Sequence, residues 1–144
     1  MSWRISIILY LLIISACKHE KANDFEKVEA TYLIEANELK GIAQQPNIKI
    51  IDFRKKEIYE NEHIVGALNL WRTDSEDTSY TYAGIMASKT QIESLFGQLG
   101  ITTDDTIIVY DDNGLCEASR LWWILQNYDF KNLQLLHGGI SEWK

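Results

Sequence analysis

Short apolar runs alternate with amphipathic segments along most of this chain, and that order predicts strands alternating with helices. Residues 48–53 (IKIIDF), 106–110 (TIIVY) and 133–136 (LQLL) are apolar runs, which is typical of strands covered on both faces. Residues 32–34 and 67–70 are shorter candidates. Because strands connected through helices pair in parallel, the pattern predicts an α/β fold. We expect a central parallel sheet of about five strands with helices on both faces.

The strongest helix signal lies in residues 88–100. Ser88 can cap the helix, and Gln91, three residues later, completes a capping box. Gly100 stands where a left-handed residue would end the helix. One apolar stripe follows the helical spacing: Ile92, Leu95, Phe96 and Leu99. Other helices are expected over residues 36–44, 56–62 and 116–128, with a last helical turn around Ile140 and Trp143. In the helix 116–128, the residues expected to face a core are Ala118, Leu121, Trp122 and Leu125.

Residues 71–87 (WRTDSEDTSYTYAGIMA) have no hydrophobic period and are expected to form a loop. A loop of this length in a compact domain is often functional or makes a contact.

The amino terminus has a separate pattern that is not expected to belong to the fold. Arg4 contributes one positive charge, and residues 5–14 (ISIILYLLII) are continuously apolar. A helix that spans a bilayer needs about 20 apolar residues, so this run suits the apolar part of a secretory signal instead. It ends in Ile14-Ser15-Ala16-Cys17, which resembles the box of bacterial lipoproteins, whose cysteine becomes the lipidated first residue.

This interpretation divides the chain into a lipoprotein-type signal peptide over residues 1–16, a polar tether over 17–30 and a folded domain over 31–144. The protein is then exported and held by lipid on Cys17 at the bacterial cell envelope, on the periplasmic side or the surface. Two alternatives stay open. One is an ordinary export signal cleaved near Ala16, with Cys17 incidental, and the other is an uncleaved anchor.

Composition narrows the possible classes of function. The 144 residues suffice for one domain, and 46% hydrophobic with 24% charged residues is the balance of a globular protein. The formal charge is −7 without a cluster of lysine or arginine, so no nucleic-acid partner is expected. The three histidines lack the spacing of a metal site, and no cofactor is expected. If Cys17 is acylated, Cys116 is a lone thiol.

In an open parallel sheet, ligands bind beyond the carboxyl ends of the strands. Asp52 and Arg54 stand at one predicted strand end, Asp111 follows a second, and His137 follows a third. Residues 111–115 lead directly into a predicted helix, so their backbone N–H groups can form a cup for an anion. The chemistry is therefore expected around this loop.

Three segments of the chain resemble the rhodanese family of sulfurtransferases: IDFRKKEIYENEHIVGALNL, VYDDNGLCEASRLWW and LLHGGISEW. The first is similar to the family's Asp-x-Arg strand end followed by a Gly-His-Ile-Pro-Gly-Ala segment, where Glu62 here replaces the first Gly and Val65 the Pro. The resemblance spans residues 31–144 and implies a rhodanese-like fold. Within this family, the chain resembles the amino-terminal half of tandem-domain thiosulfate or 3-mercaptopyruvate sulfurtransferases, whose second domain carries the catalytic cysteine.

The resemblance implies a non-catalytic amino half of a two-domain enzyme, with a second rhodanese domain as its partner in cis or in trans. Asp111 stands where the family has its sulfur-carrying cysteine. The substrate or anion loop comprises Asp111, Asp112, Asn113, Gly114, Leu115 and Cys116. A carboxylate cannot carry sulfur, and adjacent acids repel an anionic donor by roughly 1–4 kcal/mol per pair at close range. We expect the Asp111 carboxylate to occupy the cup itself and the chain alone to be inactive.

Cys116 is the remaining candidate nucleophile of the loop. It lies near a predicted helix amino terminus, where a thiolate is favoured, and could carry a persulfide or sense redox state. Related phosphatases place five residues between their cysteine and arginine, whereas three residues separate Cys116 from Arg120. We therefore interpret Cys116 as a small, half-buried core residue.

The other singled-out residues are expected to order structure or contact a partner. Asp52 and Arg54 are expected to order the loop after their strand or to face a neighbouring domain, and Arg54 could instead bind an anion. His63 is expected to hydrogen-bond to loop backbone, and His137 is interpreted as structural. Because Trp122 and Trp123 are adjacent on one helix, one ring faces the core, and Trp123 is expected to pack on a second domain.

A function of another class stays open: a stand-alone, lipid-anchored binding module that keeps the fold without the chemistry. A reading frame that continues beyond Lys144 into a domain with a cysteine-containing loop would favour the two-domain enzyme instead.

Overall fold

The computed structural model describes residues 32–144. Its centre is a fully parallel, five-stranded sheet with the strand order β1-β5-β4-β2-β3. The strands are β1 (Leu33–Ile34), β2 (Ile48–Asp52), β3 (Leu68–Asn69), β4 (Thr106–Tyr110) and β5 (Leu133–Leu136). The predicted α/β fold with a parallel sheet is confirmed.

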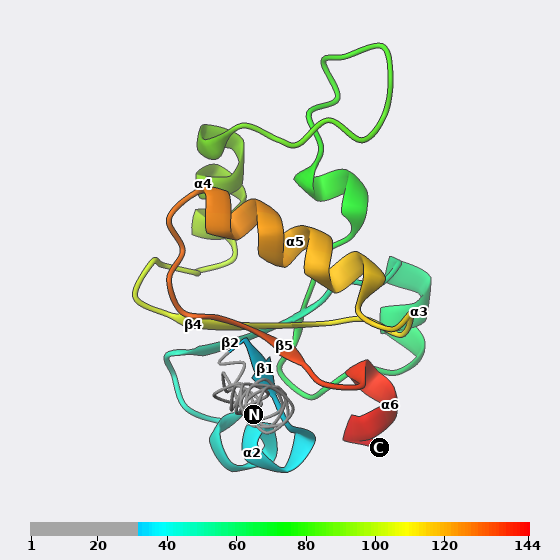
Figure 1. The fold of residues 1–144 in the computed structure, drawn as a ribbon, viewed down its shortest axis with the longest axis vertical. Coiled ribbons are helices and arrows are strands. Elements are labelled where there is room, and N and C mark those ends of the chain that lie inside the picture. The colour runs from blue at the N-terminus through cyan, green and yellow to red at the C-terminus, as the bar shows by residue number, and fades with distance from the viewer. Residues whose placement is uncertain (1–31) are drawn as a thin grey trace, which may run out of the picture.

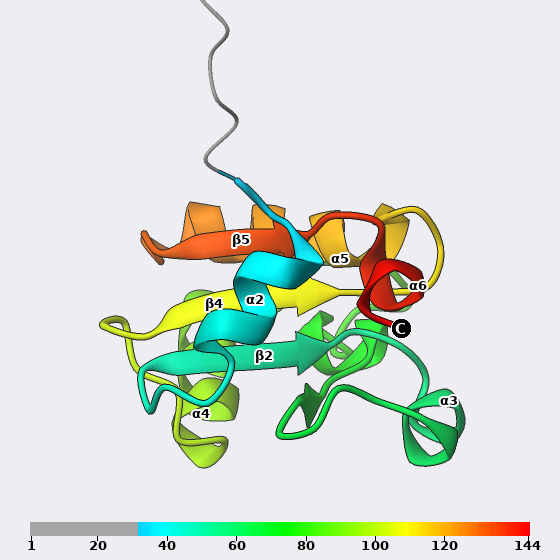
Figure 2. The ribbon, with the colours of Figure 1, turned by 90° about the horizontal axis from the view of Figure 1, so that it is seen from below.

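Helices cover both faces of this sheet, as Figures 1 and 2 show. The helices are α2 (Ala36–Ile42), α3 (Lys56–Asn61), the 3-10 turn η1 (Arg72–Ser75), α4 (Lys89–Gln98), α5 (Cys116–Asn127) and α6 (Gly139–Trp143). α2 and α6 lie on one face, whereas α4 and α5 lie on the other (Figure 2). α3 lies near the carboxyl edge of the sheet, beyond the end of β2 (Figure 2).

Strand β4 illustrates why the central strands are continuous apolar runs. Ile107 and Val109 are fully buried in the core beneath α4 and α5. Ile108 and Tyr110 are fully buried in the core beneath α2 and α6. Because successive side chains of a strand point to opposite faces, a strand covered on both sides needs apolar residues at every position.

The helix expected over residues 88–100 forms as α4, and its capping box is confirmed. The backbone N–H of Ser88 donates to Gln91 Oε1 at 2.7 Å, and Ser88 Oγ accepts the N–H of Gln91 at 3.4 Å. Gly100 has a φ of +70°, the left-handed conformation expected after a helix end. The apolar stripe packs on the core, with Ile92 and Phe96 fully buried.

The edge strands are shorter than the apolar pattern suggested. β1 and β3 contain two residues each, where residues 32–34 and 67–70 were expected. An edge strand has a neighbour on one side only, so its length depends on where that neighbour's hydrogen bonds end rather than on its own apolar run. The helix expected over residues 36–44 likewise ends at Ile42.

The aperiodic segment 71–87 is held to α5 by charged side chains. Arg72 Nε lies 2.9 Å from Glu76 Oε1, and Arg120 Nη2 of α5 donates to the carbonyl of Gly84 at 2.9 Å. Burial alone would raise the pKa of Glu76, but the hydrogen bond from Arg72 and the charge of Arg120 bring that pKa below its ordinary value. The segment is therefore a fixed part of the domain surface.

The expected signal peptide, the lipidation at Cys17 and the tether fall in residues 1–31, outside the described residues. Between residues 32 and 144, no helix is both long and apolar enough to cross a membrane.

Candidate functional site

The loop between β4 and α5 wraps around the carboxylate of Asp111, which is 1% exposed. Asp111 Oδ1 accepts the backbone N–H of Asn113 at 3.0 Å and of Leu115 at 2.9 Å. Asp111 Oδ2 accepts the N–H of Glu117 and of Ala118, each at 2.9 Å. All four donors point at one carboxylate, and the amino terminus of α5 adds the favourable field of the helix dipole. The amide cup is therefore already filled by this side chain.

Two consecutive left-handed residues give the loop its curvature. Gly114 has a φ of +63° and Leu115 a φ of +66°. Leucine rarely adopts this conformation because of its Cβ, so the cost must be offset elsewhere. The hydrogen bond from the Leu115 N–H to the Asp111 carboxylate provides one such contribution, and it ties the backbone conformation to the acid at position 111.

The turn after β5 supports the loop from the opposite side. The N–H of Ile140 donates to the backbone carbonyl of Asp111 at 3.0 Å. Gly139 has a φ of +61°, and a Cβ added there would collide with the same carbonyl oxygen. Both glycines after His137 have a positive φ, and Gly139 is required in addition by its close approach to the loop.

Replacing Gly139 with alanine is expected to lower the free energy of unfolding by about 2–3 kcal/mol, because the added methyl group meets the Asp111 carbonyl and a left-handed φ disfavours alanine. Gly97→Ala is the matched control: Gly97 lies in α4, and a Cβ there meets nothing within 4 Å. That control should be neutral or stabilising by up to about 1 kcal/mol. Urea unfolding of both variants checks this, and equal stabilities would contradict the predicted contact.

A buried ion pair stands beside the loop at the end of β2. Arg54 Nε and Nη2 donate to the two oxygens of Asp52 at 2.8 and 2.6 Å, and Nη2 also donates to the carbonyl of Glu62 at 2.7 Å. The Tyr110 hydroxyl donates to Asp52 Oδ2 at 2.6 Å and accepts the N–H of Ile64 at 3.1 Å. The network joins the ends of β2 and β4 to the segment after α3.

The pKa of the Arg54 guanidinium is raised, chiefly by its hydrogen bonds to Asp52, although burial opposes this. Burial raises the pKa of the Tyr110 hydroxyl above its ordinary value, and the hydrogen bond to Asp52 raises it further. Arg54 therefore stays charged and Tyr110 stays protonated at any physiological pH.

The cavity next to the loop has a volume of about 440 Å³. It is lined by Phe53, Arg54, Lys55, Ile58, Trp71, Asp111, Asp112, Asn113 and Glu117. Arg54 Nη1 lies 3.9 Å from Asp112 Oδ2, a distance too long for a hydrogen bond. Arg54 is already paired with Asp52, and the acids Asp111, Asp112 and Glu117 outnumber Lys55, the other cation of the cavity, so the site does not favour an anion.

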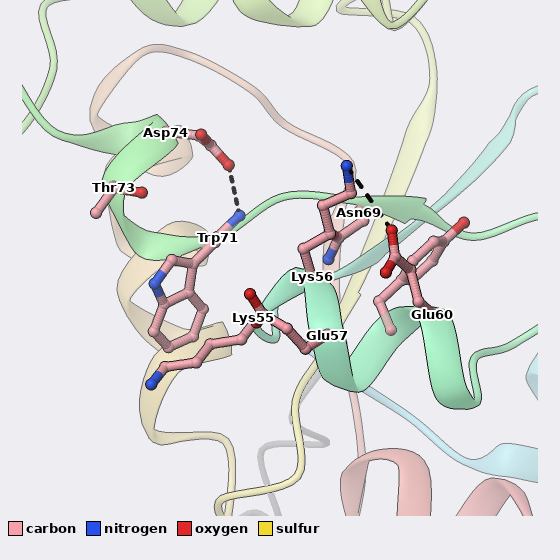
Figure 3. Close-up of a pocket in the computed structure, with 9 residues that line it drawn as sticks. Lys55, Lys56, Glu57, Glu60, Asn69, Trp71, Thr73 and Asp74 are labelled. Atoms are coloured by element: carbon pink, nitrogen blue, oxygen red, sulfur yellow. Dashed lines mark hydrogen bonds and ion pairs between the residues drawn. The ribbon is translucent and has the colours of Figure 1, made fainter.

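A larger cavity of about 830 Å³ lies between α3 and η1 and does not include the loop (Figure 3). Lys55 and Trp71 line both cavities, and the Lys55 ammonium lies 5.9 Å from the centre of the Trp71 ring. The dashed lines in Figure 3 mark the Lys56–Glu60 ion pair and the hydrogen bond from the Trp71 backbone N–H to Asp74. We assign the functional site to the smaller cavity, because it is the one that adjoins the loop and the buried ion pair.

Cys116 is exposed, so its interpretation as a half-buried core residue is wrong. It is the first residue of α5, whose buried face is formed by Ala118, Leu121 and Leu125. At 100° per residue, that face leaves Cys116 on the outer side of the helix. Cys116 does not line the cavity beside the loop. Among residues 32–144, no cluster of histidine, cysteine, aspartate or glutamate could hold a metal ion.

The remaining predicted residues lie apart from the cavity. Trp123 is 54% exposed on α5, whereas Trp122 packs against the core. His63 Nδ1 lies 2.8 Å from the carbonyl of Tyr59, as expected for a backbone contact, and His137 pairs with Glu35 at 2.8 Å.

Sequence reasoning missed several residues of the site, among them the polar residues Tyr110, Lys55 and Glu117. Tyr110 stands directly before Asp111, and its polar tip at the end of an apolar strand was an available signal. Lys55 and Glu117 follow Arg54 and Cys116 in the sequence, but nothing local distinguishes them from surface charges.

The comparisons with known proteins agree with this fold. The profile of the Rhodanese-like domain family matches residues 35–144. A thiosulfate sulfurtransferase of Pseudomonas aeruginosa is 29% identical over 111 residues, covering 77% of this chain and 41% of that protein. The thiosulfate sulfurtransferase of Rattus norvegicus is 26% identical over 108 residues, covering 68% of this chain and 36% of that protein.

The crystal structure of the 3-mercaptopyruvate sulfotransferase SseA from Escherichia coli superimposes with a TM-score of 0.71 at 26% identity, covering 78% of this chain and 47% of that one. The chain thus spans less than half the length of these relatives. The match of the family profile over residues 35–144, together with the parallel sheet, shows that the chain belongs to the rhodanese-like domain family.

Proposed function

We propose that this chain is a non-catalytic rhodanese domain that works with a second rhodanese domain, in cis or in trans, whose loop carries the sulfur-bearing cysteine. The carboxylate of Asp111 within the amide cup supports this most directly. The resemblance of the loop implies that Asp111 takes the family's cysteine position. Its carboxylate accepts the N–H groups of Asn113, Leu115, Glu117 and Ala118.

Sulfur transfer makes demands that this loop does not meet. A thiolate must attack the outer sulfur of an anionic donor such as thiosulfate, forming a persulfide and releasing sulfite. The attacking atom and the donor both need the N–H groups of the cup, which here already bind an oxygen acid. Asp112 and Glu117 also place negative charge at the cavity that the donor would use.

The test is thiosulfate:cyanide sulfurtransfer by the purified chain without any partner. We expect no turnover above the rate without protein, and no change in the variant Cys116→Ser. A purified single-domain rhodanese that carries the loop cysteine serves as the positive control. Clear turnover that disappears in Cys116→Ser would overturn the assignment and favour Cys116 as a persulfide carrier. Mass spectrometry after treatment with a sulfur donor, showing no added sulfur atom on Cys116, would exclude that alternative.

The second candidate is a stand-alone binding module that keeps the fold without the chemistry. The complete Asp52–Arg54–Tyr110 network and the open cavity beside an occupied cup are compatible with this role as well. The natural reading frame beyond Lys144 separates the two candidates. A following domain with a cysteine in its loop supports the two-domain enzyme, and a stop codon supports the module or a partner in trans.

We further propose that the chain is exported and lipid-anchored through Cys17 at the bacterial cell envelope. The support is the sequence Ile14-Ser15-Ala16-Cys17 after an apolar run that is too short to span a bilayer. Mass analysis of the amino-terminal peptide should show an acylated Cys17, and the variant Cys17→Ser should leave the membrane fraction.

A further inference from the structure

The cavity beside the loop and the larger cavity adjoin each other at the carboxyl edge of the sheet. Lys55 and Trp71 line both cavities, so the two meet at these side chains. Figure 3 shows the Trp71 ring and the Lys55 side chain next to each other. We call the two cavities together the acidic groove, after the six carboxylates that line it: Glu57, Glu60, Asp74, Asp111, Asp112 and Glu117.

The cations that line the acidic groove are fewer than its carboxylates, and two of them are already paired. Arg54, Lys55 and Lys56 are the three cations among the lining residues. Arg54 donates two hydrogen bonds to the carboxylate of Asp52, and Lys56 Nζ lies 3.7 Å from Glu60 Oε1. The groove therefore repels a further anion and attracts a cation from outside the chain.

Two carboxylates of the smaller cavity lack hydrogen-bond donors. Asp112 accepts no hydrogen bond within the described chain, and its side chain is 42% exposed with Arg54 Nη1 at 3.9 Å. Glu117 Oε1 lies 3.5 Å from Arg72 Nη1, but the other oxygen, Oε2, is buried and has no hydrogen-bond partner among residues 32–144. A buried carboxylate oxygen without a donor is unfavourable. A cationic donor that enters the cavity would pair with Asp112 and offset the cost at Glu117.

The same cavity has an apolar wall beside these acids. Phe53, Ile58 and Trp71 line it, and Ile58 of α3 is 39% exposed. Arginine and lysine side chains combine an apolar stem with a cationic head, so the stem can pack on this wall while the head reaches the carboxylates. A metal ion would leave the wall unused, and no cluster of ligands for a metal ion exists within residues 32–144. The lining therefore fits the side chain of a basic residue.

We infer that the acidic groove is the docking surface for a basic segment of a protein partner, with one arginine or lysine side chain in the smaller cavity. This inference rests on the proposed function, in which the chain acts through a partner and not by its own chemistry. A second rhodanese domain fits the requirement, because a loop that binds an anionic sulfur donor and lowers the pKa of its thiol needs positive charge around it. The formal charge of −7 adds long-range attraction for such a surface.

The test measures the binding of a short peptide of alternating arginine and alanine to the purified full chain, by isothermal titration calorimetry at low salt. The same peptide with glutamate in place of arginine is the charge-reversed probe. We expect the arginine peptide to bind at least about tenfold more tightly than the glutamate peptide, and its affinity to fall as the salt concentration rises. In NMR spectra, the indole N–H signal of Trp71, identified by its loss in Trp71→Phe, should shift when the arginine peptide is added.

Two variants show where the peptide binds. Asp112→Asn is expected to weaken the binding of the arginine peptide about two- to fivefold, because it removes a carboxylate that the chain leaves without a donor. Asp104→Asn is the matched control: it removes the same charge, but Asp104 is exposed in the loop before β4, at the opposite edge of the sheet. It should leave the dissociation constant unchanged, so a difference between the two variants reports on position and not on net charge.

Three results would overturn the inference: equal affinities for the two peptides, equal effects of Asp112→Asn and Asp104→Asn, or no shift of the Trp71 signal. A shift caused by thiosulfate but not by the arginine peptide would also overturn it, because the groove would then bind an anion. The proposed function fails by a different result, which is thiosulfate turnover by the chain alone. An inactive chain that does not distinguish the two peptides leaves the proposed function in place and overturns the inference about the groove.

Discussion

Replacing Asp111 with alanine is expected to lower the free energy of unfolding by about 3–5 kcal/mol. The substitution leaves four backbone N–H groups without their acceptor, and two of them belong to the first turn of α5. Water can reach part of the loop, which keeps the loss below the sum of four charged hydrogen bonds. Urea unfolding, followed by circular dichroism, measures the change.

Two further variants show whether the lost stability comes from the hydrogen bonds between the Asp111 carboxylate and the backbone N–H groups of the loop. Asp112→Asn is the matched control, because Asp112 is the neighbouring acid but its side chain is 42% exposed and accepts no hydrogen bond within the described chain. It should change stability by no more than about 0.5 kcal/mol. Asp111→Asn keeps one acceptor oxygen but turns an NH2 group toward two N–H donors. Its free energy of unfolding should therefore lie between those of Asp111→Ala and the wild type. If Asp111→Ala is as stable as Asp112→Asn, the carboxylate does not hold the loop.

Replacing Arg54 with methionine is expected to lower the free energy of unfolding by about 3–5 kcal/mol, because it leaves the carboxylate of Asp52 buried without its cation. Methionine keeps the apolar volume of the side chain, so the loss reports on charge rather than on packing. Asp52 then retains only the Tyr110 hydroxyl and the backbone N–H of residue 54 as donors. Equilibrium unfolding in urea provides the measurement.

A double-mutant cycle with Asp52→Asn separates pairing from burial. The double variant removes both charges. Its loss in the free energy of unfolding should therefore be smaller than the sum of the losses in the two single variants, with a coupling energy of about 1–3 kcal/mol. Lys56→Met is the matched control, since Lys56 pairs with Glu60 at 3.7 Å while both side chains are mostly exposed. Lys56→Met should change the free energy of unfolding by no more than about 0.5 kcal/mol. Additive effects of Arg54→Met and Asp52→Asn would show that the pair is not coupled.

Elements with strong local signals could be predicted from the sequence. The helix over residues 88–100 has its cap, its capping box and its apolar stripe within one segment, and α4 forms there as expected. The apolar runs at 48–53, 106–110 and 133–136 form the three strands that have a neighbour on each side. In each case the pattern that predicts the helix or strand lies within the segment that forms it, so the element can be predicted without knowing its distant contacts.

Elements whose limits depend on distant partners could not be predicted. The two edge strands are shorter than their apolar runs, because each pairs with one neighbour only. Cys116 is exposed, contrary to the expectation, because the rotation of α5 is set by the packing of Ala118, Leu121 and Leu125 against the sheet. The position of Cys116 near a helix start was visible in the sequence, but the side of the helix on which it lies was not.

By itself, the sequence determined the chemical character of the loop: it begins with the oxygen acid Asp111, and no arrangement of the backbone can make a carboxylate carry sulfur. Only the tertiary structure decided what that acid does instead. The hydrogen bond from Tyr110 to Asp52 spans 58 positions, and Gly139 approaches the Asp111 carbonyl from the turn after another strand. These contacts form because the parallel sheet brings the carboxyl ends of β2, β4 and β5 to one edge, a proximity that follows from strand order and not from any local pattern.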